Sequence, residues 1–167
     1  MSWYKLAKIS MTEKEFNTKL KDAIRLNPFF VVLFKKFHVP VERMYTNLTF
    51  KVGEIDGKNA ISDAETITFN KKLLKSNFFE EGLHYVVHEM VHWLQRQREG
   101  NMYFSDPEEI EAFSTGIAYE LGRGKKEEDI RAIYYPIIVD HFNNPTDAEK
   151  MFCSLVFDAK KRLKDFK

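Results

Sequence analysis

Residues 84–95 read His-Tyr-Val-Val-His-Glu-Met-Val-His-Trp-Leu-Gln. Apolar residues recur here at the three- and four-residue spacing of an amphipathic helix, and the pattern extends over about residues 77–99. On a helical wheel they fill one broad sector: Phe79, Leu83, Val86, Val87, Met90, Val91, Trp93 and Leu94. The three histidines lie on the other side together with Glu89. The stretch therefore predicts a long helix that packs by one face and carries imidazoles on the opposite face.

His88 and His92 are one helical turn apart, so both can direct an imidazole nitrogen at a metal ion beside the helix. Glu89 projects from the same half of the helix at a different angle. That position suits a carboxylate that holds water at a metal without binding the metal. Residues 88–92 thus match the His-Glu-x-x-His pattern of zinc sites.

His84 is spaced too far from His92 to share its metal. At a rise of ~1.5 Å per residue the two lie about 12 Å apart along the helix axis, whereas zinc–nitrogen bonds are about 2 Å long. The pair His84 and His88 is a geometric competitor, but no glutamate directly follows His84. We expect His84 to support a ligand or to lie at the surface.

A catalytic zinc site normally takes three protein ligands, so a third must come from elsewhere. The pattern with a third histidine further along the same helix fails, because Gln95 and Arg98 stand where Gly and His are needed. A glutamate is therefore the expected type of ligand.

A following helix, opened by Asp106 and Pro107, offers Glu108, Glu109 and Glu111 for that role. Glu109 lies on a stripe with two small residues, Ala112 and Gly116, which allow close helix packing. We favour Glu109 as the third ligand and keep Glu111 as the alternative. Glu109 is also well placed simply to stabilise the helix N-terminus.

The remaining pattern predicts an α+β domain, mostly helical, with a small sheet before the central helix. We interpret residues 1–167 as a single domain. Thr12 and Glu15 form a capping box, and Leu48, Phe50 and Val52 alternate as in a half-buried strand. Helices are expected over 12–26, 106–122, 126–142 and 147–166, and a hairpin-like pair of strands over 47–55 and 65–69.

Composition limits the function classes. With 167 residues and 44% hydrophobic residues the chain can bury one sizeable core, and its formal net charge of +1 gives no support for nucleic-acid or anionic-membrane binding. The only cysteine, Cys153, excludes an intramolecular disulfide and is expected on the buried face of a helix. No signal-like or membrane-spanning run is apparent, and we expect a cytoplasmic protein.

The motif at residues 88–92, followed by Glu109-Ile110-Glu111-Ala112, resembles the gluzincins, zinc metallopeptidases whose third ligand is a glutamate. The likeness is to small single-domain members and covers roughly residues 47–122. It implies that His88, His92 and Glu109 bind Zn²⁺, that Glu89 is the general base, and that a protein or peptide is the substrate. The strand at 65–69 would be the edge along which an extended peptide lies.

Such an enzyme needs a further donor for the oxyanion, and the candidates are Tyr119, Tyr134, Tyr135 and His141. Each of these is more often a packing aromatic or a surface histidine. Two other functions stay open: a zinc-binding protein without catalysis, and a helical interaction module. The latter would use the apolar run 29–34 or the leader Trp3-Tyr4-Lys5-Leu6, although apolar runs of this size usually pack on a core.

Overall fold

The computed structural model describes residues 11–75, 77–99, 106–140, 142 and 144–167. This part of the chain is mostly helical with one small three-stranded sheet, so the α+β class is confirmed. None of its helices combines the length and the apolar character needed to cross a bilayer. The chain divides into two compact units, Met1–Phe104 and Ser105–Lys167. That the whole chain is one domain stays a prediction.

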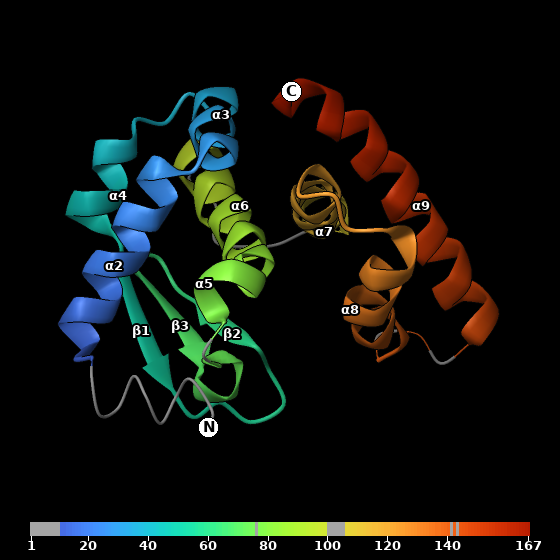
Figure 1. Ribbon diagram of the computed structural model, residues 1–167, viewed down its shortest axis with the longest axis horizontal. Coiled ribbons are helices and arrows are strands. Elements are labelled where there is room, and N and C mark those ends of the chain that lie inside the picture. The colour runs from blue at the N-terminus through green and yellow to red at the C-terminus, as the bar shows by residue number, and fades with distance from the viewer. Residues whose placement is uncertain (1–10, 76, 100–105, 141, 143) are drawn as a thin grey trace. The chain divides into compact units, whose positions relative to one another are not determined.

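The first unit combines the small sheet with helices that precede and follow it in the chain (Figure 1). Its elements are α2 (Glu13–Leu26), α3 (Pro28–Lys36), α4 (Val41–Asn47), β1 (Thr49–Gly53), β2 (Ala60–Ser62), β3 (Thr66–Asn70), the 3-10 turn η1 (Lys71–Leu73), α5 (Phe78–Glu81) and α6 (Leu83–Glu99). The predicted capping box begins α2, because the Glu15 N–H donates to Thr12 Oγ1 at 3.1 Å and the Thr12 N–H to Glu15 Oε2 at 2.6 Å. Helices α3 and α4 and strand β2 were not predicted.

The strand order is β1-β3-β2, with β1 parallel and β2 antiparallel to β3. The expected hairpin of β1 with β3 is therefore wrong, because β2 intervenes in the chain and is itself the hairpin partner of β3. Asp63 Oδ1 accepts hydrogen bonds from the N–H groups of Glu65 and Thr66 and so closes that hairpin. Both sides of β3 are paired, so the prediction of an edge strand at 65–69 is also wrong; among the described residues the edge strands are β1 and β2.

The predicted helix over 77–99 is two helices, α5 and α6, separated at Gly82. A Cβ at this position would lie 2.6 Å from Phe78 Cδ2 and 2.8 Å from Phe78 O, so the close approach of the two segments requires glycine. The apolar sector of α6 is confirmed as core, since it contributes fully buried side chains: Val86, Val87, Met90, Val91, Trp93 and Leu94.

The run 29–34 is also largely core, because Phe30, Leu33 and Phe34 on α3 are buried while Val31 is exposed. Helix α3 begins after Asn27, which caps it: the Asn27 side chain accepts a hydrogen bond from the Phe29 N–H at 2.9 Å. The leader at residues 3–6 lies outside the described residues.

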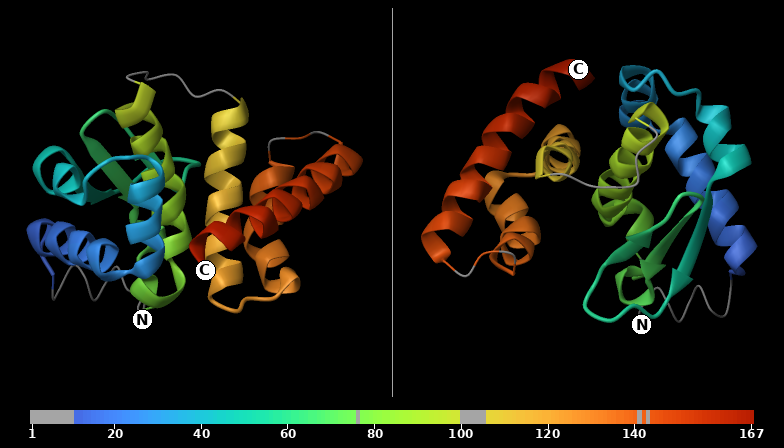
Figure 2. Two further views of the ribbon diagram at one scale, coloured as in Figure 1. Left: turned by 90° about the horizontal axis from the view of Figure 1, so that it is seen from above. Right: turned by 180° about the vertical axis from the view of Figure 1, so that it is seen from behind.

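The second unit consists of α7 (Asp106–Gly122), α8 (Glu127–Val139), α9 (Pro145–Leu163) and the 3-10 turn η2 (Lys164–Phe166). Helix α9 packs against both α7 and α8 (Figure 2). It begins two residues before the predicted Asp147, because Asn144 caps it by accepting from the Thr146 N–H at 2.9 Å. Cys153 was expected to be buried and is exposed, because the buried face of α9 is formed by Phe152, Leu155 and Val156.

Candidate metal centre

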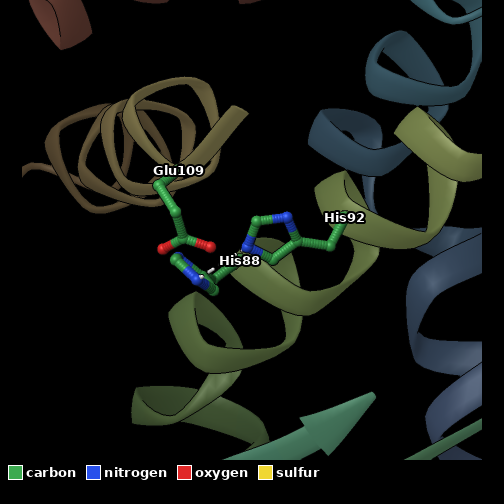
Figure 3. A group of neighbouring side chains, drawn as sticks. All are labelled: His88, His92 and Glu109. Atoms are coloured by element: carbon green, nitrogen blue, oxygen red, sulfur yellow. Dashed lines mark hydrogen bonds between the residues drawn. The ribbon is translucent and has the colours of Figure 1, made fainter. Parts of the chain in front are cut away.

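The imidazoles of His88 and His92 meet beside α6 (Figure 3). Their Nε2 atoms lie 3.2 Å apart, and the two rings are nearly perpendicular, at 79°. Two nitrogens bound to one tetrahedral zinc at 2.0–2.1 Å are separated by about 3.3 Å. The two histidines therefore already hold the separation that a shared zinc ion requires.

Gln95 fixes the ring of His92 from the other side. Its Oε1 lies 3.0 Å from His92 Nδ1, and both side chains are buried. With the proton on Nδ1, the ring donates to this amide oxygen and the lone pair lies on its Nε2. This is the tautomer that a metal-binding Nε2 needs.

His84 is buried and was expected to support a ligand or to lie at the surface; the surface alternative is wrong. Its ring packs on that of Tyr85, with centroids 4.1 Å apart. Burial raises the pKa of this tyrosine, so its hydroxyl stays neutral at ordinary pH. The aromatic contact gives His84 a packing role.

Glu89 is half-buried on the turn of α6 that also carries His88. The cation Arg96 follows it two turns later and is itself buried. Burial lowers the pKa of the Arg96 guanidinium, and the negative charges of Glu89 and Asp63 oppose that shift. Glu89 therefore lies within the electrostatic reach of a buried positive charge.

Arg96 also connects α6 to the sheet through hydrogen bonds. Its guanidinium donates hydrogen bonds to the carbonyl oxygen of Asp63 and to Ser62 Oγ, at the end of β2. These charge-assisted bonds hold the edge strand against α6. Sequence reasoning missed both Gln95 and Arg96 as supporting residues, although Gln95 at three residues from His92 shares its helix face.

Glu109 and Glu111 lie in the second unit, on the first two turns of α7, and both are half-buried. Glu109 is the third residue labelled in Figure 3, and its part in a metal site stays a prediction. Glu111 pairs with Arg162 of α9, with a carboxylate oxygen 3.8 Å from Nη1. This ion pair gives Glu111 a role within its own unit.

The rings of the three tyrosines considered as oxyanion donors all contact side chains within the second unit. The Tyr134 ring lies edge-on to Phe113 and that of Tyr135 edge-on to Phe152, at centroid distances of 6.4 Å and 5.9 Å. Tyr119 is buried with the guanidinium of Arg123 5.7 Å from its ring centre. His141 lies outside the described residues.

No protein-family model, no curated protein and no solved structure matches the chain. The resemblance to the gluzincins therefore rests on the residues of α6 and α7 themselves.

Proposed function

We propose that this chain is a zinc-dependent metallopeptidase that hydrolyses peptide bonds in a protein or peptide substrate. The observation that carries the proposal is the pair of Nε2 atoms, 3.2 Å apart, within a His-Glu-x-x-His sequence on one helix. The buried hydrogen bond from His92 to Gln95 supports it, because it favours the tautomer that binds a metal. A cytoplasmic location stays a prediction.

Glu109 is the proposed third ligand. Together with His88 and His92 it would supply two imidazole nitrogens and one carboxylate oxygen, a donor set suited to catalytic zinc. Glu111 is the weaker choice, because a carboxylate held by Arg162 would have to leave a cation in order to bind another.

Bound zinc would supply a stronger water nucleophile and would polarise the scissile carbonyl. Glu89 would accept the proton of the attacking water and pass it to the nitrogen of the leaving amine. The buried positive charge of Arg96 interacts with the negative charge of Glu89 across two turns of α6.

The test compares the parent with Glu89→Gln on a library of internally quenched peptides, with zinc content measured in both proteins. We expect zinc in both and cleavage by the parent, reduced at least about 100-fold in the variant. Equal cleavage by the variant would remove Glu89 from the mechanism. Zinc in both proteins without cleavage by either would instead favour a zinc-binding protein without catalysis.

A further inference from the structure

A small apolar pocket lies in the first unit among α2, α3 and the start of α4, and we call it the α2–α3 pocket. Its volume is about 200 Å³, and its walls include the buried side chains of Ile24, Phe30, Phe34 and Val39. Val31 also lines it and is 41% exposed, so apolar surface continues from the pocket to the outside of the molecule.

The lining also includes Pro40, Val41 and two exposed cations, Arg25 and Lys35, and no carboxylate belongs to it. Neither cation forms an ion pair with a carboxylate within the described part of the chain. Arg25 also lies over the ring of Tyr45, with its guanidinium carbon 6.0 Å from the ring centre. An apolar hollow flanked by two positive charges is complementary to an apolar group flanked by negative ones.

The size of the pocket restricts its occupant. Sites for drug-sized ligands are about 300–1,000 Å³, larger than this pocket, whereas a single large side chain commonly anchors a protein interface by filling a hollow of its own. We propose that the α2–α3 pocket binds a segment of a partner protein in which one large apolar side chain is flanked by aspartate or glutamate.

The residue that precedes Val39 in the pocket wall adopts an uncommon backbone conformation. His38, between α3 and α4, has φ = 55°, in the left-handed region that non-glycine residues seldom occupy. The turn is closed by hydrogen bonds from the His38 N–H to Lys35 O at 3.0 Å and from the Val39 N–H to Phe34 O at 3.2 Å. This turn directs Val39 into the wall of the pocket.

The charge pattern favours a partner over the chain's own leader. Residues 3–8, Trp-Tyr-Lys-Leu-Ala-Lys, supply apolar groups but carry only positive charges. Arg25 and Lys35 would repel these lysines and attract carboxylates instead.

Phe34 connects the pocket to a spectroscopic reporter. It lines the pocket, and its ring centroid lies 6.3 Å from that of the buried Trp93 on α6. The chain has two tryptophans, so Trp3→Phe leaves Trp93 as the only one. Filling the pocket is expected to change the emission of this indole.

The experiment uses full-length Trp3→Phe protein and four fluorescein-labelled peptides. Each has two glutamates on either side of one central residue, which is Phe, Leu, Met or Trp. We expect saturable binding of at least one peptide by anisotropy, weakened by salt, and a shift of Trp93 emission with the unlabelled Phe, Leu or Met form. Replacing its central residue by Ala, or its glutamates by lysines, should weaken binding at least about tenfold.

The matched variants reverse two charges each. Arg25→Glu with Lys35→Glu should weaken binding at least about tenfold, whereas Lys51→Glu with Lys58→Glu, at exposed positions on the same unit, should leave it unchanged. Binding by His92→Ala should equal that of the parent, because the pocket contains no proposed zinc ligand. This result is independent of whether the peptidase proposal holds.

Four results would overturn the proposal. The first is that none of the four peptides binds saturably. The second and third are that the Ala-centred peptide binds as tightly as the parent peptide, or that the variant reversed at Arg25 and Lys35 binds as tightly as the parent protein. The fourth is that sodium dodecanoate displaces the peptide and binds at least as tightly as the peptide does. The last would assign the pocket to a fatty acid rather than to a protein segment.

Discussion

The Oε1 atom of Gln95 lies 3.0 Å from Nδ1 of His92, and both side chains are buried. This contact orients the ring and directs the lone pair of His92 Nε2 toward His88. An α-helix alone would place the two histidines on one side, but it would not select the tautomer of His92. Zinc binding at the proposed site is therefore expected to depend on Gln95 as well as on the two histidines.

Removing this hydrogen bond should weaken zinc binding without removing a ligand. We expect Gln95→Leu to raise the zinc dissociation constant about 10- to 100-fold, because the ring loses its partner at Nδ1. Titration against a chromophoric chelator measures it. Gln97→Leu, two residues further along α6, is the control and should bind zinc like the parent; equal losses in the two variants would argue against the contact.

Substitution of the two candidate carboxylates should separate their roles. Glu109→Gln is expected to weaken zinc binding more than about tenfold, because the amide is a poorer ligand than the carboxylate. Glu111→Gln should leave zinc binding unchanged and lower the free energy of unfolding by up to about 1 kcal/mol, through loss of its ion pair with Arg162. Zinc titration and urea unfolding distinguish the two variants. Loss of zinc binding in Glu111→Gln but not in Glu109→Gln would make Glu111 the ligand.

Lys21 provides a pH-dependent prediction. It is buried on α2, its Nζ donates to the carbonyl oxygen of Tyr45 at 3.3 Å, and burial lowers its pKa below 10.5. At pH values between the pKa of Lys21 in the folded protein and its pKa in the unfolded chain, the unfolded chain binds the proton more tightly. The free energy of unfolding therefore rises with pH in that range. Lys21→Met should stabilise the protein at pH 7, and the gain should shrink as pH approaches 10.5.

Urea unfolding at several pH values checks this prediction, with Lys14→Met as the control because Lys14 is exposed on the same helix. A stability gain that stays constant from pH 7 to 10.5 would show that the charge of Lys21 is not its source.

The longer helices were predicted where they carry clear local signals, whereas the short helices α3 and α4 and the break between α5 and α6 were not. The capping box of Thr12 and Glu15 begins α2, and the apolar sector of α6 is buried as expected. The sheet was predicted less well, because strand order depends on contacts between distant residues. Strand β2 has only three residues, too few for an alternating pattern, and without it β1 and β3 were read as a hairpin.

In the candidate site, too, the residues placed by helix geometry were predicted, whereas those that depend on distant contacts were not. One-turn spacing was enough to bring His88 and His92 together, because it depends on helix geometry alone. Arg96 could not be assigned from the pattern of α6, since its partners Ser62 and Asp63 lie more than thirty residues away and belong to the unpredicted hairpin. The break at Gly82 depends on the position of Phe78, which the helical period did not reveal.

Zinc per chain, measured by elemental analysis of desalted protein grown with zinc, tests the central claim most directly. The parent and His84→Ala are expected to contain about one zinc ion per chain and His92→Ala essentially none, because only His92 shares a metal position with His88. Absence of zinc from the parent, or equal zinc in the parent and His92→Ala, would contradict the assignment of His88 and His92 as ligands.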